Sequence, residues 1–352
     1  MNIIYLVTGG AGHLGNTIVR LLCEQKKHVR VLVLKNDATA ENLTPEVEIF
    51  YGDVTDKASM REFFTIPIGF EAIVIHSAGI VTIASKFNRR VFDVNVSGTK
   101  NIVDMCVENR VKRLVHVSSV HAIPELEKGV AISEISAFNP ENVIGLYAKT
   151  KSEATEYVLQ AAKKGLDACV VHPSGISGPY DYGHGHLTQL LIDYCNGTLT
   201  AGVNGGYDFV DVRDVALGII ACCEKGRSGE CYILSNRYFS IRELFDIFYK
   251  VTGKHKIKTI LPMWFAKGTA ALSELYYKLR KQPPLYTAYS LYTLSSNANF
   301  SNEKAKRELG FTNRPFEETV ADAVDWLTEQ GRIKPVKHTH RDKTSSNKAS
   351  QA

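Results

Sequence analysis

Few features of this sequence could cross-link the chain or hold it in a membrane. Its seven cysteines are an odd number, are scattered and form no C-x-x-C pair, so we expect reduced, mostly buried thiols. No apolar run reaches the roughly 18 residues that span a bilayer. The first apolar stretch has no basic segment before it and runs directly into glycines, unlike a secretory leader. We therefore expect a cytoplasmic protein without stable membrane insertion.

The chain also lacks a charge imbalance over most of its length. Six of its 42 basic residues and one of its 37 acidic residues lie in residues 331–352, which leaves 36 of each sign before residue 331. A body without net charge gives no electrostatic reason to bind nucleic acid. The basic end is polar and has no apolar periodicity, so we expect 331–352 to be a disordered tail.

Clusters of metal ligands are missing as well. The segment Gly183-His184-Gly185-His186 brings two histidines together, but no further candidate ligand follows at a spacing typical of a zinc site. We interpret this segment as a flexible glycine loop, and we expect the protein to have no metal site.

What the sequence does contain is an alternation of predicted strands and helices. Its 352 residues suffice for a large α/β domain with a smaller lobe. Apolar runs that suit strands buried on both faces alternate with helical patterns up to about residue 175. This order predicts a Rossmann-type, doubly wound parallel sheet. The predicted strands are 29–34, 47–51, 72–75, 114–117 and 168–171, and the predicted helices are 57–64, 89–109 and 147–164.

The second half of the chain has a different texture. A loop rich in Gly, Pro and Tyr at 175–185 precedes it. We expect a dinucleotide-binding domain at 1–175, to which segments near 205–235 return, and a mainly substrate-binding α/β lobe at 176–330. The predicted elements after the loop are a helix at 211–224, a strand at 230–234, a helix from the capping box Ser240-x-x-Glu243 to Gly253, an amphipathic lid or core helix at 262–281, and a last helix at 316–330.

The first fifteen residues carry the strongest single motif. A short apolar strand leads into Thr8-Gly-Gly-Ala-Gly-His-Leu-Gly, after which a helical pattern begins. Glycines at positions 9, 12 and 15 allow a tight turn, close approach of a pyrophosphate to the backbone, and packing of the helix on the strand. The helix that opens at His13 and Leu14 offers unpaired N–H groups to phosphates. Strand, glycine turn and helix in this order predict a dinucleotide site.

A second motif offers acid–base chemistry. Tyr147 and Lys151 are four residues apart on a predicted helix, so both side chains lie on one face. A neighbouring ammonium favours the phenolate and lowers the pKa of a tyrosine from its usual value near 10. Ser119 follows the predicted strand 114–117, where its hydroxyl would reach a ligand crevice and hold a substrate oxygen. We predict these three residues to be catalytic, and we expect Ser118 either to face the cofactor or to pack.

Together with further segments in the right order, these motifs resemble the extended short-chain dehydrogenase/reductases, within the NAD-dependent epimerase/dehydratase family, over roughly residues 1–330. The chain looks most similar to the branch of dihydroflavonol 4-reductase and 3β-hydroxysteroid dehydrogenase. The segments that carry the resemblance are Thr8–Gly15, Gly52–Asp56, His76–Gly79, Asn95–Asn101, Val117–Ser119, Tyr147–Lys151, His172–Pro179, Phe209–Val215 and Lys306–Phe311.

The resemblance implies a role for each matched position. Tyr147 would be the general acid–base, and Ser119 would orient the substrate oxygen. Lys151 would lower the pKa of the tyrosine and hold the nicotinamide ribose. Asp53 would accept a hydrogen bond from the adenine amino group, and Val54 would donate one through its backbone. The remaining expected cofactor contacts are Gly9, Gly12, His13, Leu14, Gly15, Ser77, Ala78, Gly79, Ser118, Pro173, Gly175 and Ile176.

The choice between NADP and NAD depends on the end of the second predicted strand. Enzymes that choose NAD commonly place an acid about 20 residues past the fingerprint, where it binds the ribose 2′-hydroxyl. Here the strand end is not acidic, and Lys35 is placed to pair with a 2′-phosphate. Asp37 follows closely and keeps NAD open. We favour NADP, with NAD as the alternative.

Two branches of the family imply different reactions. Reductases like dihydroflavonol reductase transfer a hydride between nicotinamide and a ketone or secondary alcohol, whereas sugar-nucleotide epimerases and dehydratases oxidise and re-reduce the substrate with tightly bound NAD. After Ser119 the chain reads Val-His-Ala-Ile-Pro, without the Tyr-Gly of many epimerases. The apolar, aromatic stretch 262–292 also suits a less polar substrate. We favour a reductase acting on a small, fairly apolar molecule.

Two expectations remain open at this point. A dinucleotide-binding sensor or scaffold without catalysis is an alternative, because a fold alone does not give a function. The presence of Ser119, Tyr147 and Lys151 argues against it.

Many relatives pair through helices equivalent to 89–109 and 147–164, so we expect a homodimer. Within the first of these helices, Asn95 either supports the site or has a structural role alone.

Overall fold

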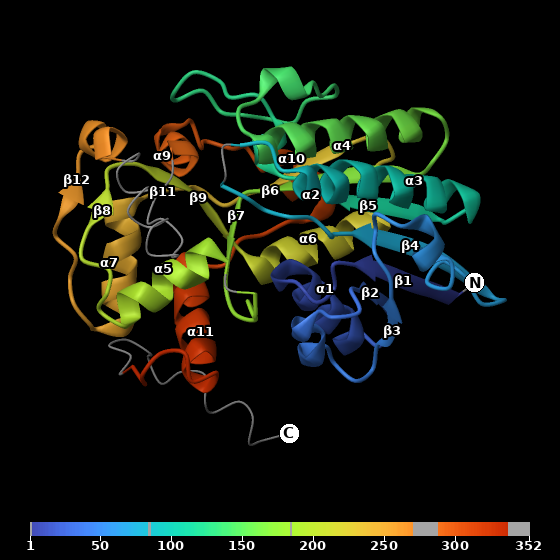
Figure 1. The fold of residues 1–352 in the computed structure, drawn as a ribbon, viewed down its shortest axis with the longest axis horizontal. Helices are drawn as coiled ribbons and strands as arrows, with labels where there is room; N and C mark the ends of the chain where they lie inside the picture. The colour runs from blue at the N-terminus through green and yellow to red at the C-terminus, as the bar shows by residue number, and fades with distance from the viewer. Residues whose placement is uncertain (1, 84–85, 184, 270–287, 337–352) are drawn as a thin grey trace.

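The computed structural model describes residues 2–83, 86–183, 185–269 and 288–336, and its central element is a seven-stranded parallel sheet (Figure 1). The strand order is β3-β2-β1-β4-β5-β6-β10, so the chain starts inside the sheet and winds to one edge before it fills the other. This order confirms the predicted doubly wound fold. The strands are β1 Asn2–Thr8, β2 His28–Val33, β3 Glu48–Tyr51, β4 Phe70–His76, β5 Arg113–Val117, β6 Ala168–Pro173 and β10 Cys231–Leu234.

Helices cover both faces of this sheet (Figure 1). Side chains alternate between the two faces, so Val74 and Leu114 join the core under α3 and α4, whereas Ile75 and Val115 join the core under α1 and α6. Each such side chain stabilises the fold by roughly 1.5–3 kcal/mol when it is fully buried. The helices are α1 His13–Glu24, α3 Thr99–Glu108, α4 Leu146–Lys163 and α6 Val212–Lys225.

The last strand of the sheet comes from the second half of the chain. β10 pairs in parallel with β6, with Cys231 opposite Val170. α6 packs beside α1, and α10, Glu303–Leu309, packs against α6 and β10. Segments after residue 205 therefore complete one edge and one helical layer of the dinucleotide-binding fold.

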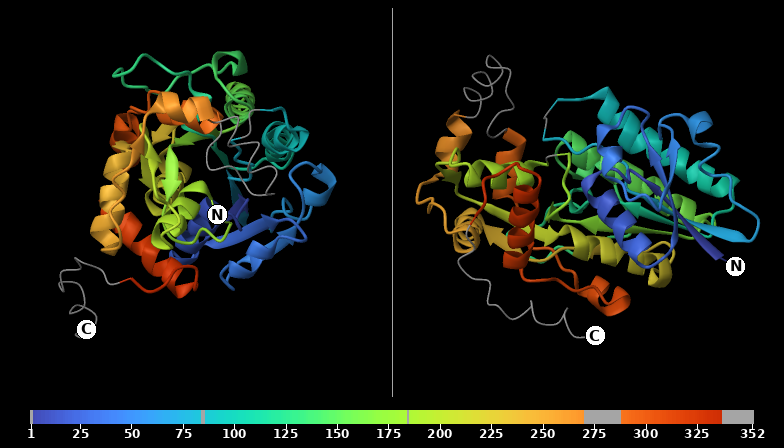
Figure 2. Two further views of the ribbon diagram at one scale, coloured as in Figure 1. Left: turned by 60° about the vertical axis from the view of Figure 1, so that its left-hand side comes forward. Right: turned by 90° about the horizontal axis from the view of Figure 1, so that it is seen from below.

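A smaller lobe lies at one end of the sheet (Figures 1 and 2). In its three-stranded sheet, β9 is parallel to β7 and antiparallel to β11, and β8 pairs separately with β12. The rings of Phe209, Phe239 and Phe316 stack in its core with centroids 4.7 to 6.3 Å apart. The elements are β7 Gly175–Ser177, α5 His186–Cys195, β8 Gly202–Val203, β9 Gly206–Asp211, β11 Tyr238–Ser240, α7 Ile241–Thr252, β12 Ile260–Leu261, α9 Ala288–Ser295 and α11 Phe316–Glu329.

The helix predicted at 89–109 is interrupted. α2, Arg89–Phe92, leads into a wider π-type turn, η3 Asp93–Gly98, before α3 begins. Inside this turn the Asn95 side chain bonds the N–H and C=O of Ile80 at 2.8 and 3.0 Å and the Thr150 hydroxyl at 3.1 Å. The turn thus lets Asn95 connect the loop after β4 to α4 and support both. In a regular helix this side chain would point in another direction.

Two further helix predictions have opposite outcomes. The predicted helix at 57–64 is only a short 3₁₀ turn, η2 Lys57–Met60. The predicted helix start is confirmed, because the Ser240 hydroxyl accepts a hydrogen bond from the N–H of Glu243 at 3.1 Å, whereas the Glu243 carboxylate pairs with Arg237. The same helix ends at Gly253, whose φ of 62° lies in the left-handed region that glycine tolerates.

The amphipathic stretch at 262–281 is helical at 263–269, and its positions from 270 onward lie outside the described residues. The predicted disordered tail at 331–352 is wrong in its first residues, because Ile333 is buried and Val336 packs against the core. From residue 337 onward the tail also lies outside the described residues. Among the residues that the structure describes, no helix is both long and apolar enough to cross a membrane.

Candidate active site

The fingerprint turn lies at the carboxyl end of β1, where the strand order reverses between β2 and β4. A side chain on Gly9 would place its Cβ 2.6 Å from the backbone nitrogen of Ala78, and one on Gly15 would place it 2.1 Å from the carbonyl oxygen of Gly9. A Cβ on Gly12 would meet nothing closer than 3.4 Å. Glycine is therefore required for packing at positions 9 and 15, whereas at Gly12 the nearest atom leaves space for a side chain.

The N-terminus of α1 faces this space without a side-chain cap. Gly12 is the N-cap residue, no side chain bonds the first N–H groups, and the first turn holds no acid. Unpaired N–H groups at a positive dipole end bind anions, so the backbone of His13 and Leu14 fits a phosphate. The His13 ring has another partner, since its Nε2 donates to the carbonyl oxygen of Pro179 at 2.9 Å and burial lowers its pKa. The side chain of Leu14 packs against the core.

Polar groups follow β3 where an adenine ring would lie. Asp53 accepts two hydrogen bonds at 2.8 Å, from the backbone and the hydroxyl of Thr55, and both go to Oδ1. Neither bond uses Oδ2, which suits an amino donor. Val54 is buried, and its carbonyl accepts a bond from Asn101 at 2.9 Å, so its backbone is held in place.

The turn after β4 connects the cofactor region to the catalytic helix. The Ser77 hydroxyl donates to the carbonyl of Thr8 at 2.7 Å, and the N–H of Ala78 donates to the Thr8 hydroxyl at 3.3 Å. A Cβ on Gly79 would lie 3.2 Å from the Nζ atom of Lys151. These three predicted residues therefore lie between the end of β1 and the Lys151 side chain of α4.

The end of β2 bears on the choice between the two cofactors. Lys35 is exposed in the turn that follows the strand. Asp37 is already used locally, since its Oδ1 accepts bonds from the backbone and hydroxyl of Thr39 at 2.9 and 2.6 Å and caps the turn at 38–42. The exposed Lys35 is therefore placed to meet a ligand, and Asp37, like Asp53, caps its turn through Oδ1 alone and keeps Oδ2 for a ligand.

Ser119, Tyr147 and Lys151 meet at the carboxyl end of β5. All three are more than 90% buried, at 6, 8 and 5% exposure. Ser119 accepts the N–H of His121 at 3.2 Å, and its hydroxyl lies near enough to Tyr147 to oppose the effect of burial on the pKa of the phenol. The Nζ atom of Lys151 donates to the carbonyl oxygen of Val117 at 2.9 Å. The fold thus brings together the serine, tyrosine and lysine that the sequence predicted.

The acidity of this group differs from the sequence expectation. Burial raises the pKa of Tyr147 to about 12, and the group that opposes burial is the hydroxyl of Ser119 rather than the ammonium of Lys151. Burial also lowers the pKa of Lys151 to about 8. Desolvation thus decides the pKa of Tyr147 in this arrangement, and the lowering by Lys151 that the sequence suggested stays a prediction.

Some of the predicted cofactor contacts have other partners in the structure. Ser118 shares a 2.6 Å hydrogen bond with the buried hydroxyl of Thr155, so it packs against α4 rather than facing the cofactor. Ile176 packs against the core under α1 and α6. Pro173 ends β6, and a Cβ on Gly175 would lie 2.8 Å from the carbonyl oxygen of Asp208. Pro173 and Gly175 therefore determine the backbone path where β6 leads into the lobe.

An aromatic wall beside Tyr147 was missed by the sequence reasoning. The ring of His121 lies 6.0 Å from the ring of Tyr147, 5.5 Å from that of Tyr207 and 6.2 Å from that of Tyr289. His121 was within reach of prediction, because it is a polar residue just past Ser119. Tyr207 and Tyr289 come from β9 and α9 of the lobe, and no local pattern marks them.

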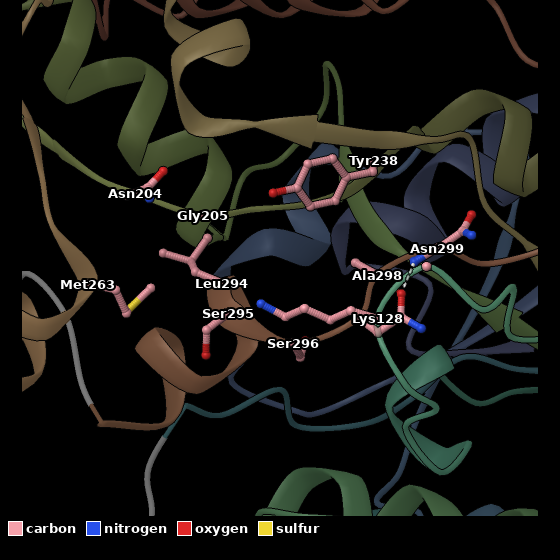
Figure 3. A pocket seen from close by; sticks show the side chains of 12 residues that line it. Lys128, Asn204, Gly205, Tyr238, Met263, Leu294, Ser295, Ser296, Ala298 and Asn299 are labelled. Carbon is pink, nitrogen blue, oxygen red and sulfur yellow. Dashed lines mark hydrogen bonds between the residues drawn. The ribbon is translucent and has the colours of Figure 1, made fainter.

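A separate cavity of about 470 Å³ opens in the lobe (Figure 3). Lys128, Tyr238, Met263 and Leu294 line it together with the segment 295–299. Its lining includes none of the three catalytic candidates, so we do not assign the chemistry to it. In the described part of the chain, no three His, Cys, Asp or Glu side chains cluster as a metal site would require.

A Rossmann-type sheet, a glycine fingerprint and a Ser-Tyr-Lys group define a nicotinamide-dependent oxidoreductase of the extended short-chain type. A profile of the NAD dependent epimerase/dehydratase family matches residues 5–235. The chain belongs to this family.

Individual relatives agree with this assignment over nearly the whole chain. The sterol demethylase protein B of Methylococcus capsulatus is 30% identical over 332 residues, covering 93% of this chain and 99% of that protein. The putative dihydroflavonol 4-reductase of Synechocystis sp. is 27% identical over 334 residues, covering 94% and 96%. The crystal structure of gox2253 is 29% identical, with a TM-score of 0.81 and coverage of 95% and 100%.

Proposed function

We propose that this protein transfers a hydride between a nicotinamide cofactor and the ketone or secondary alcohol of a small, fairly apolar substrate, as dihydroflavonol reductase does. The observation that carries this proposal is the meeting of Ser119, Tyr147 and Lys151 at the carboxyl edge of the sheet. An acid, an oxygen-orienting hydroxyl and a cation at one point are what reduction of a carbonyl requires.

The chain's own residues account for the binding and the proton. The backbone at Gly12–Leu14 would hold the pyrophosphate, and Lys151, beside Gly79, would hold the nicotinamide ribose. The bound cofactor supplies the hydride. Ser119 would orient the substrate oxygen, and Tyr147 would donate its proton to that oxygen in reduction and accept it back in oxidation. With a pKa of about 12, Tyr147 is the protonated acid at neutral pH, which suits reduction.

The wall of the site favours an apolar substrate. Tyr207 is 6% exposed and Tyr289 is 8% exposed, and their rings face the site together with His121. Burying such rings favours apolar ligands more than charged ones. The names of the two curated relatives refer to a sterol and to a dihydroflavonol, which are both ring compounds of low polarity.

We further propose NADP as the preferred cofactor. The exposed Lys35 at the end of β2 offers a charge to the 2′-phosphate, whereas Asp37 caps the turn at 38–42 through Oδ1 and keeps Oδ2 for a ribose hydroxyl. The family description names NAD, which remains the alternative.

The epimerase or dehydratase reaction is the second candidate, because the matching family includes both. Nicotinamide absorbance of the purified protein with NADPH or NADH, and a panel of ketones, ketosteroids, flavanonols and nucleotide sugars, separates the two. Stoichiometric consumption with a ketone supports the reductase and identifies the cofactor. Conversion of a nucleotide sugar without net consumption would replace the proposal with the epimerase reaction, and binding of cofactor without turnover of any ketone, steroid or sugar would favour a sensor.

A further inference from the structure

The aromatic wall of the site has one group whose hydrogen bonding is incomplete. Tyr147, His121, Tyr207 and Tyr289 come from α4, the turn after β5, β9 and α9, and their rings surround His121. The hydroxyl of Ser119 lies near enough to Tyr147 to lower the pKa that burial raises. The hydroxyl of Tyr207 lies 3.0 Å from the Nε2 atom of His121, with the two rings nearly parallel at 13°.

The hydroxyl of Tyr289 has no such partner. It is fully covered, and among the residues that the structure describes no atom forms a hydrogen bond with it. Thr293, one turn further along α9, lies near enough to oppose the effect of burial on the pKa of Tyr289, but its hydroxyl donates to the backbone oxygen of Tyr289 at 3.1 Å. A covered hydroxyl without a partner is unfavourable, so it requires an explanation.

The position of this hydroxyl points to a ligand. The ring of Tyr289 lies 6.2 Å from that of His121, whose ring in turn lies 6.0 Å from that of Tyr147. The ring of Tyr289 also lies directly on Gly145, where a Cβ would come within 2.2 Å of it, just before α4 begins. Tyr289 is therefore held in place at the edge of the reaction space.

The wall is also uncharged. Burial raises the pKa of Tyr289 to about 12 and that of Tyr207 well above its usual value, and it lowers the pKa of His121 to about 4. All three residues are neutral at pH 7. Among the described residues, the ring contacts and hydrogen bonds of these three involve no Lys or Arg side chain. Within the described part of this wall, a carboxylate or phosphate would find no countercharge, whereas an uncharged oxygen would find a donor.

We propose that Tyr289 donates a hydrogen bond to a second, uncharged oxygen of the substrate, distinct from the oxygen that Tyr147 protonates. The preferred substrates are then neutral ketones or alcohols that carry a further hydroxyl or carbonyl group. This inference rests on the proposed hydride transfer, and it assigns a substrate feature to a residue of the lobe.

The test compares the full-length protein with its Tyr289→Phe variant on three ketone probes: flavanone, 3-hydroxyflavanone and 6-hydroxyflavanone. The wild type should favour one hydroxylated probe over flavanone about tenfold in kcat/KM, as the loss of one hydrogen bond in a dry site predicts. Tyr289→Phe should abolish that preference and leave turnover of flavanone within about threefold. Equal losses on all probes, or an unchanged preference, would overturn the inference.

Two controls separate this role from a structural one. Tyr292→Phe removes a hydroxyl on the same helix that is bonded to Glu125, and it should retain the preference. The melting temperature of Tyr289→Phe should not fall, because the deleted hydroxyl has no partner within the described structure. A clear fall in the melting temperature would assign the hydroxyl to the fold instead.

A binding measurement keeps the inference independent of turnover. Calorimetric titration of each probe into protein saturated with NADP⁺ gives the affinities without reaction. If no probe is reduced, yet the wild type binds a hydroxylated probe about tenfold more tightly and Tyr289→Phe does not, the inference holds and the proposed reaction fails. Equal affinities for all three probes in the wild type would refute the inference whatever the turnover.

Discussion

The Nζ atom of Lys151 donates a hydrogen bond to the carbonyl oxygen of Val117 at 2.9 Å. Val117 ends β5, and Ser119 follows it by two residues, so this bond fixes α4 against the point where the strand ends. Tyr147 lies one turn before Lys151 on the same face of the helix and is thereby brought to Ser119. The bond thus holds Lys151, one turn after Tyr147, beside the strand end that leads to Ser119.

Tyr147→Phe should abolish most of the turnover while cofactor binding is retained. The substitution removes the proton donor but keeps the ring, and general acid–base groups contribute about 10²–10⁴-fold to rates. Steady-state kinetics with the best ketone of the panel and fluorescence titration with NADPH measure the two effects. Tyr157→Phe, on the same helix but bonded to Asp104, is the matched control and should be nearly normal. Near-normal turnover of Tyr147→Phe would refute the catalytic assignment.

The pH dependence of the free energy of unfolding should reflect the ionisation of Lys151. Its pKa is lowered by burial to about 8 from the usual 10.5, so between these values the unfolded chain binds more protons than the folded one. The free energy of unfolding without cofactor should therefore rise with pH across this window. In Lys151→Met, urea denaturation at a series of pH values should lose this rise.

The activity should change in the opposite direction over the same range. The ammonium form of Lys151 holds the ribose, so kcat/KM for reduction should decrease as pH rises above about 8. Lys149→Met, an exposed residue of the same helix that pairs with Glu141, should keep both pH profiles. A kcat/KM that stays level through pH 10 would contradict the role of Lys151.

Gly12→Ala and Gly15→Ala should separate ligand binding from folding. A methyl group at Gly12 meets nothing closer than 3.4 Å, and its φ of −75° suits any residue, so thermal stability without cofactor should hardly change. The same methyl group would occupy the pyrophosphate space and should weaken NADPH binding at least about tenfold. At Gly15 the added Cβ collides with the Gly9 carbonyl at 2.1 Å, which should destabilise the fold by roughly 1–3 kcal/mol or more. Equal destabilisation by both variants would argue against a phosphate site at Gly12.

Lys35→Ala should weaken NADPH more than NADH. Removing a charged hydrogen bond to the 2′-phosphate costs about 1.5–3 kcal/mol, which corresponds to a loss of at least about tenfold for NADPH alone. The dissociation constants of both cofactors, obtained by fluorescence titration, provide the comparison. Lys27→Ala, just before the other end of β2, should alter neither. Equal losses for the two cofactors would remove the basis for an NADP preference.

Much of the fold followed from short-range patterns in the sequence. The apolar runs of the central strands, the glycine spacing from Gly9 to Gly15 and the capping box at Ser240 each depend on neighbours a few residues away. Such patterns constrain the backbone locally, so they predicted the parallel sheet, the dinucleotide turn and the start of α7. The helical face shared by Tyr147 and Lys151 belongs to the same class of information.

Other features arose only when distant segments packed together. The return of β10 to the sheet, the π-type turn around Asn95, and the tyrosines that β9 and α9 bring to His121 all depend on long-range contacts. The high pKa of Tyr147 is also such a feature, because desolvation is a property of the whole surroundings and not of a spacing. The sequence by itself determined which chemistry the chain carries, through residue types at local spacings. The tertiary structure decided how strongly those groups are buried and which walls face the substrate, because only packing excludes water and joins the lobe to the sheet.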